Sequence, residues 1–146
     1  MSTNQAELVR VCQELGVPFS VLEKSDAQAF IQSAIGKFMP AKTSGHLSIG
    51  GDAVALPLEE HEFTYSENLP NSPVIVFFDQ ENHNRGMALR LSDGRVLGRV
   101  MGKSFGMEYF VTDPNLSFLL AVNWYAIEGT GVVEQWMTAL DNVEET

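Results

Sequence analysis

The chain has little that would support a disulfide framework, a membrane span or a binding site for polyanions. Its 146 residues include one cysteine, Cys12, and so no internal disulfide, which is typical of a reducing compartment. Apolar runs are short, so we expect no membrane-spanning helix. The opening MSTNQAELVR lacks the basic start and apolar stretch of a signal peptide, and the cytoplasm is the expected compartment.

Basic residues are also scarce. Lys and Arg number 9 against 19 Asp and Glu, which gives a formal charge of −10 at neutral pH. Such a chain repels nucleic acid and anionic membranes, and it attracts a basic protein. Acidity alone has a simpler interpretation, because many proteins are acidic for solubility.

The sequence has none of the common catalytic or metal-binding motifs. The histidines His46, His61 and His83 do not have the spacing of a zinc motif. Cys12 lies on an apolar helical stripe and is expected to be a core residue, and Ser104 lacks a Gly-x-Ser-x-Gly context. We therefore expect no catalytic residue, no metal site and no cofactor.

One segment, GRVLGRVMGKSFG at residues 94–106, contains the last three letters of a phosphate-binding P-loop, Gly102-Lys103-Ser104. The motif needs its first glycine at position 97, which is Leu97, and Gly98 is one residue too close. The following FGMEYFVTD is strand-like, so no helix N-terminus is expected there to hold a phosphate. We interpret the segment as a turn between strands.

Two helices are predicted at the start of the chain. STNQAELVRVCQELG has an apolar stripe with period 3.6 and a capping box of Ser2 and Gln5. SDAQAFIQSAIGKFMP repeats the pattern, with Ser25 as the predicted cap and Pro40 at its end.

The middle of the chain has the period and turn residues of a sheet. HLSIGGDAVALPL predicts two short strands around Gly50-Gly51, and VIVFFD predicts a central strand that is covered on both faces. MALRLSDGRVLGRVM predicts a hairpin with a type I′ turn at Asp93-Gly94, which would pair Leu91 with Val96.

Two further helices are predicted at the end. Asp113-Pro114 resembles a helix start for NLSFLLAVNWYAIEG, and TGVVEQWMTALDN gives a last amphipathic helix. The expected fold is a single α+β domain over residues 1–146, with two N-terminal helices, a mainly antiparallel five- to six-stranded sheet and two C-terminal helices.

The run VIVFFDQENHNRGMALRLSDGRVLGRV, followed by Asn115, Ser117, Phe118 and Leu119, resembles the central meander and closing element of the SUKH superfamily of bacterial immunity proteins. The resemblance covers roughly residues 73–122. It implies a non-enzymatic cytoplasmic protein, an antitoxin that binds a cognate toxin, often a nuclease or deaminase, and blocks it.

The charges are unevenly distributed along the chain. Five of the nine basic residues lie within residues 85–103, whereas carboxylates gather in the polar segment before and after the central strand. We predict that a basic toxin binds these carboxylates, Glu59, Glu60, Glu62, Glu67, Asp79 and Glu81. In the other interpretation, the basic and acidic stretches offset each other on one surface.

A second function class stays open on the sequence alone. The protein could be a small enzyme or a ligand-binding domain whose site uses the Tyr, His and Glu residues around 59–65. Such a site would need the fold to bring these residues into a cleft.

Overall fold

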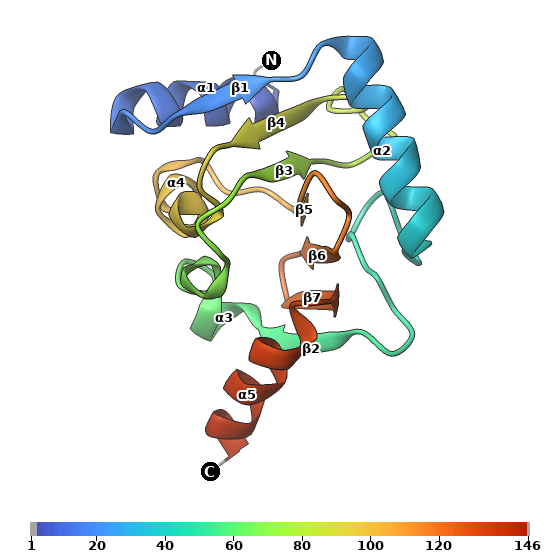
Figure 1. The fold of residues 1–146 in the computed structure, drawn as a ribbon, viewed down its shortest axis with the longest axis vertical. Coiled ribbons are helices and arrows are strands. Elements are labelled where there is room, and N and C mark those ends of the chain that lie inside the picture. Colours follow the sequence, from blue (N-terminus) through green and yellow to red (C-terminus); the bar gives the residue numbers. More distant parts are fainter. Residues whose placement is uncertain (1–2, 146) are drawn as a thin grey trace.

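The computed structural model describes residues 3–145, with side chains described through residue 142. Its centre is one antiparallel sheet with the strand order β1-β4-β3-β5-β6-β7-β2 (Figure 1). The seven strands are Phe19–Val21 (β1), Val54–Pro57 (β2), Val74–Phe77 (β3), Ala88–Leu91 (β4), Tyr109–Thr112 (β5), Phe118–Val122 (β6) and Ala126–Gly131 (β7). The helices are Asn4–Leu15 (α1), Lys24–Phe38 (α2), Leu58–His61 (α3), Leu97–Lys103 (α4) and Glu134–Glu145 (α5), with 3-10 turns at Tyr65–Asn68 (η1) and Gly94–Val96 (η2).

Helices cover both faces of the sheet, which therefore has two hydrophobic cores. Side chains alternate along β3, so Val74 and Val76 pack with α1 and α4, whereas Ile75 and Phe77 pack with α2. Figure 1 shows α2 on one side of the strands and α1 and α4 on the other. All four β3 residues are buried, as predicted for a central strand covered on both faces.

The two N-terminal helices are confirmed, but their caps differ from the prediction. Thr3 caps α1 by accepting a hydrogen bond from the Ala6 N–H at 3.0 Å, and the predicted cap Ser2 lies outside the described residues. α2 begins at Lys24, with Glu23 in the cap position, so the prediction that Ser25 is the cap is wrong. Between the helices the short strand β1 pairs with β4, which the sequence analysis did not predict.

The predicted hairpin at Asp93-Gly94 is wrong. Asp93 has φ −132° and accepts a hydrogen bond from the Arg95 N–H at 3.0 Å, so it caps a turn that leads into α4. Only the first half of the segment, β4, is a strand. Leu97, Val100 and Met101 follow a helical spacing, and all three are buried against the α1 side of the sheet.

Gly102-Lys103-Ser104 is the end of α4 rather than a turn between strands. Ser104 is the C-cap residue, and its hydroxyl donates to the Met101 carbonyl at 2.9 Å. Because α4 precedes Ser104, the C-terminal, carbonyl end of the helix lies at this serine. This end of a helix dipole disfavours a phosphate.

The predicted helix NLSFLLAVNWYAIEG is a β-hairpin, β6–β7, so the helix start at Asp113-Pro114 is also wrong. The Asp113 carboxylate accepts hydrogen bonds from the Ser117 N–H and hydroxyl, and Leu116 adopts a left-handed φ of 54°. Phe118–Val122 is buried throughout, and an apolar run of this length does not distinguish a buried strand from a buried helix. The sheet thus has seven strands instead of five to six, and α5 is the one C-terminal helix in the described chain.

Only one of the two strands predicted around Gly50-Gly51 joins the sheet. Val54–Pro57 forms β2, while Ser48 makes an isolated bridge with Lys42 outside the sheet. Leu47 and Ile49 nevertheless pack into the α2-side core. The segment 41–50 is therefore a covering loop rather than a strand.

Two tyrosines form a buried polar contact that joins η1 to β5. The Tyr65 and Tyr109 hydroxyl oxygens are 2.7 Å apart, and the residues are 0% and 2% exposed. Burial raises the pKa of both phenols, that of Tyr65 well above its usual value. Both groups therefore stay neutral, and each hydroxyl has the other as its partner.

Removal of one hydroxyl of this pair should cost more than removal of both. Tyr65→Phe leaves the Tyr109 hydroxyl buried without a partner, and we expect a loss of about 1–3 kcal/mol in the free energy of unfolding. The double variant Tyr65→Phe/Tyr109→Phe should recover part of that loss. Urea denaturation of the four proteins measures the coupling, and two strictly additive losses would contradict it.

Gly94 is required by packing rather than by a positive φ. A Cβ at this position would lie 2.7 Å from Val74 Cγ1, so Gly94→Ala should destabilise the protein by about 1–3 kcal/mol. Gly36→Ala is the matched control. Its Cβ meets nothing within 4 Å, and in the last turn of α2 it should stabilise by up to about 0.5–1 kcal/mol. Thermal melts that show the same shift for both variants would contradict the packing argument.

Candidate functional site

One edge of the sheet collects three of the four exposed aromatic side chains of the described residues, together with several acidic ones. Successive antiparallel pairs place β2, β3 and β6 in the same direction, so their C-terminal ends lie at this edge. Five segments meet there: α3 after β2, the loop after β3, the β6–β7 turn, the residues before β5, and the loop 41–50. We call this surface the aromatic–acidic edge, and define it by His46, Glu59, Glu60, Asp79, Phe105, Glu108, Trp124 and Tyr125.

The aromatic side chains of the edge are unusually exposed. Phe105, Trp124 and Tyr125 are 56%, 49% and 72% exposed. A Cβ at Gly106 would lie 4.0 Å from the Trp124 ring, so the glycine next to Phe105 lies against the indole. The Tyr125 ring packs edge-on against His46 with ring centroids 5.2 Å apart. Adjacent exposed aromatic rings are typical of protein-binding surfaces.

Two carboxylates lie in a small cleft beside Trp124. Asp79 accepts from the Gly45 N–H at 2.8 Å, and Glu108 accepts from the Leu47 N–H at 2.9 Å and from His46 Nδ1 at 2.8 Å. The cleft has a volume of about 220 Å³, and none of its lining residues is Lys or Arg. The charged side chains that line it are therefore both acidic, which suits a cationic group.

The glutamates of α3 extend this acidic character along the edge. The Leu58 N–H donates to the Tyr125 carbonyl at 3.2 Å, which joins the start of α3 to the β6–β7 turn. Glu59 and Glu60 follow in the first turn of α3, and both are exposed. Since β2 and β3 are four strand spacings apart, these residues and Asp79 are separated by roughly 19 Å, with the β6–β7 turn between them.

The structure separates the six predicted partner-binding carboxylates into two groups. Glu59, Glu60, Asp79 and Glu81 lie at or beside the edge, although the Asp79 carboxylate is also engaged with the Gly45 and Glu81 backbone. Glu62 is half-buried at the end of α3, and its charge helps to raise the pKa of the buried tyrosines. Glu67 is exposed but lines a different cleft.

That second cleft contains three of the basic residues. It has a volume of about 610 Å³ and lies between α4 and the segment around Phe63. Arg95, Arg99 and Lys103 recur every four residues along η2 and α4, so they share one side of the helix. Arg95 also pairs with Asp93 at 2.8 Å. Of the six predicted carboxylates, Glu67 alone lines this second cleft. None of the basic residues lines the acidic cleft at the edge.

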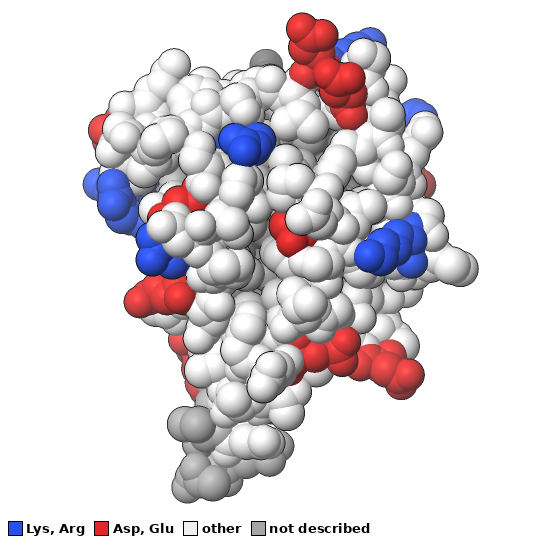
Figure 2. All heavy atoms as spheres, in the orientation of Figure 1, with Lys and Arg blue, Asp and Glu red and all other residues white. Residues whose placement is uncertain are grey.

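Figure 2 shows how the charge is distributed over one face of the molecule. Acidic side chains form small separate groups, mostly around the periphery, and uncharged side chains cover much of the centre. The excess negative charge is thus dispersed on this face.

A row of hydrogen bonds positions the loop 41–50 that carries His46. Glu128 on β7 accepts from the Ser48 hydroxyl and from the Ile49 and Gly50 N–H groups, each at 3.0 Å. Asn123 Nδ2 donates to the Leu47 carbonyl at 2.9 Å. Sequence reasoning missed these residues, although a lone carboxylate within AIEGTG is a signal that would have indicated a specific role for Glu128.

The candidate catalytic groups do not assemble into an active site. His46 contacts Glu108 at the edge, His61 ends α3, and His83 lies in the loop after β3. Among residues 3–142 no three His, Cys, Asp or Glu side chains lie close enough to hold a metal ion. Burial raises the pKa of the Cys12 thiol to about 11, so this thiol is protonated at neutral pH.

Glu7 positions the backbone next to Phe105. Its carboxylate is 8% exposed and accepts from the Phe105 N–H at 2.9 Å and from Arg10 at 3.0 Å. The hydrogen bond from Arg10 lowers the pKa of Glu7, since it favours the charged carboxylate. The charge of Glu7 therefore ties α1 to the aromatic–acidic edge.

Glu7→Gln should give a stability difference that depends on pH. Because the folded-state pKa is lowered, the stabilisation is fully present above the ordinary glutamate value of about 4.3 and is lost as the pH falls through the folded value. Thermal melts from neutral pH to about pH 3 should show the gap between wild type and variant closing. The control Glu14→Gln, whose carboxylate is 53% exposed in its pair with Arg10, should show little gap at any pH. A Glu7 gap that persists at the acid end would rule out the ionised carboxylate as its source.

No described helix has the length and apolar character to cross a membrane. The comparisons with known proteins leave the family open: no family model matches the chain, and no match was found among curated proteins or solved structures. The resemblance to the SUKH superfamily stays a prediction.

Proposed function

We propose that this protein is a non-enzymatic immunity protein that neutralises a basic toxin through its aromatic–acidic edge. The observation that carries the proposal is the combination found there: three exposed aromatic side chains, one of which, Trp124, lines a cleft that also holds two carboxylates and no Lys or Arg. The faint resemblance to the SUKH superfamily favours the same function.

The physical properties of the edge suit a cationic protein partner. Large aromatic side chains act as binding hot spots, because they bury much area and have few rotatable bonds. Exposed carboxylates such as Glu59 and Glu60 give charge complementarity, and the formal charge of −10 steers a basic partner toward the protein. The hydrogen-bonded loop 41–50 keeps His46 and Glu108 in place before binding, which lowers the entropy cost of association.

The contents of the edge cleft support binding rather than catalysis. His46 and Glu108 form a contact that could orient a general base. The cleft beside them, however, is lined by no serine, threonine, cysteine or lysine that such a base could activate. This pair is therefore assigned to structure and recognition.

A second candidate function is the binding of a small ligand in the cleft beside Phe63. The cleft is about 610 Å³ in volume, and Phe63 is 50% exposed within it. This position falls in the region 59–65 that the sequence left open for a ligand site. The Tyr65 hydroxyl cannot serve there, because it is buried against Tyr109.

The proposal is tested by binding kinetics with the product of the neighbouring gene. Trp124→Ala/Tyr125→Ala should weaken binding by about tenfold or more, mainly through faster dissociation. Glu59→Lys/Glu60→Lys should slow association and reduce its dependence on ionic strength. Phe63→Ala is the matched control, since it removes an equally exposed aromatic ring outside the edge.

Three outcomes would contradict the proposal. One is that no neighbouring product binds or is toxic when expressed alone. Another is tight binding that neither edge variant alters. The third is a loss of binding in Phe63→Ala alone, which would place the site in the second cleft.

A further inference from the structure

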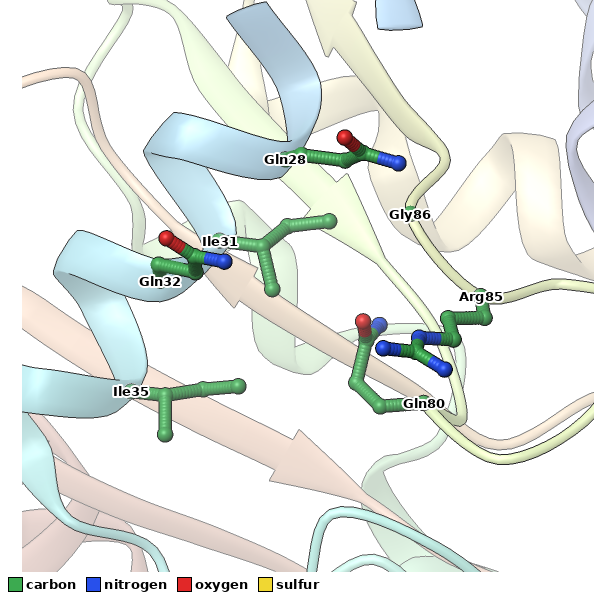
Figure 3. Close-up of a pocket in the computed structure, with 7 residues that line it drawn as sticks. All are labelled: Gln28, Ile31, Gln32, Ile35, Gln80, Arg85 and Gly86. Carbon is green, nitrogen blue, oxygen red and sulfur yellow. The ribbon is translucent and has the colours of Figure 1, made fainter. Parts of the chain in front are cut away.

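A polar cleft on the α2 side of the sheet is separate from the aromatic–acidic edge. It lies between α2 and the connection from β3 to β4, and its volume is about 310 Å³ (Figure 3). A second hollow of about 350 Å³ lies on the other side of Arg85 and Gly86, which line both. The first cleft is at the lower end of the size range of small-molecule sites.

The side chains of the cleft have an unusual composition for so acidic a protein. Three carboxamides and one guanidinium line it, from Gln28, Gln32, Gln80 and Arg85, and no carboxylate does. Figure 3 shows Gln80 and Arg85 side by side on the connection, across the cleft from the side chains of α2. Ile31 and Ile35 of α2 also line the cleft and form its apolar wall.

Arg85 is not neutralised by a neighbouring acid. Ion pairs are found for Arg10 and Arg95 in the described part of the chain, but none for Arg85, in a protein with 19 Asp and Glu. Its side chain therefore presents a guanidinium with donors to spare, which matches a carboxylate or a phosphate in geometry and charge. The carboxamides can both donate to and accept from hydroxyl or amide groups.

Hydrogen bonds position the connection that carries Arg85. The Asn84 side chain accepts from the Asn4 N–H at 2.8 Å, and the Gln80 N–H donates to the Thr43 carbonyl at 2.9 Å. The Gln80 amide group donates to the Phe78 carbonyl at 2.7 Å, which leaves its oxygen as an acceptor. A ligand would thus meet preformed groups.

Gly86 keeps the junction between the two hollows open. Its φ is +75°, and a Cβ at this position would lie 3.3 Å from the Gln28 side chain. Any larger residue would be strained and would press on Gln28. The backbone at this point therefore lies close to the Gln28 side chain of α2, in a conformation that favours glycine.

We propose that this cleft binds a small polar molecule that carries one anionic group, a carboxylate or a phosphate. Arg85 pairs with the anion, Gln28, Gln32 and Gln80 hydrogen-bond the polar body, and Ile31 and Ile35 contact its carbon skeleton. None of the residues that line this cleft belongs to the aromatic–acidic edge, so the proposal does not depend on toxin binding there.

The test is an NMR titration of the isotope-labelled protein with two polyhydroxylated probes, gluconate and ribose 5-phosphate, and with the neutral polyol sorbitol. At least one anionic probe should cause saturable shifts of the Gly86 amide and of the three glutamine side-chain amides, and sorbitol should not. The probe that binds tells whether the anion is a carboxylate or a phosphate. Arg85→Gln should weaken this binding about tenfold or more, because a charge-assisted pair is lost.

The controls separate this site from general anion binding. Arg90→Gln makes the same charge change on β4, outside both hollows, and should leave the titration unchanged. Gln32→Ala should weaken binding with the fold intact, since its side chain is exposed on α2. The proposal is overturned if neither anionic probe gives saturable shifts, if Arg85→Gln binds as well as wild type, or if sorbitol binds equally.

Discussion

The double coverage of the central strands is the constraint on which the rest of the structure depends. β3, β5 and β6 are buried on both faces, so nearly every side chain along them has to be apolar. Exceptions such as Thr112 and Tyr109 on β5 have internal partners: Thr112 donates to the Phe118 carbonyl, and the Tyr109 hydroxyl contacts that of Tyr65 on η1. Polar and charged side chains are therefore found mainly at the ends of the strands, where the aromatic–acidic edge lies, and beside α2.

Several carboxylates that contribute to the net charge are also structural anchors. Asp79, Glu108 and Glu128 each accept backbone N–H groups from the loop 41–50, which crosses the α2 side of the sheet. Glu7 does the same for the segment that carries Phe105. The carboxylates of this protein thus fall into two groups. Some hold loops in place, whereas others, such as Glu59, are exposed at the surface.

The sequence predicted the elements with a long and clear periodicity, and it failed for short apolar runs. α1, α2 and α5 are amphipathic over several turns, and β3 is a β-branched and aromatic run. Phe118–Val122 and Leu97–Lys103 are too short for periodicity to separate strand from helix, and tertiary packing decides between them. In the same way, the Asp93-Gly94 pair favours a hairpin locally, but the side chain of Asp93 caps a helical turn instead.

The candidate site was predicted in part for the same reason. The acidic segments were visible as composition, and four of the six predicted carboxylates do lie at or beside the edge. Trp124 and Tyr125 were assigned to a helix, whereas they lie in the turn between β6 and β7, which exposes them. The contacts of Glu108 and Glu128 join segments about 60 to 80 residues apart, which no local pattern encodes.

The two outermost strands decide how another chain can approach this sheet. β1 has three residues, and β2 has four and ends in Pro57, which has no N–H to offer. Short edge strands of this kind are poor templates for pairing with a strand of another chain. Docking of another chain by strand addition is therefore disfavoured at both of these strands.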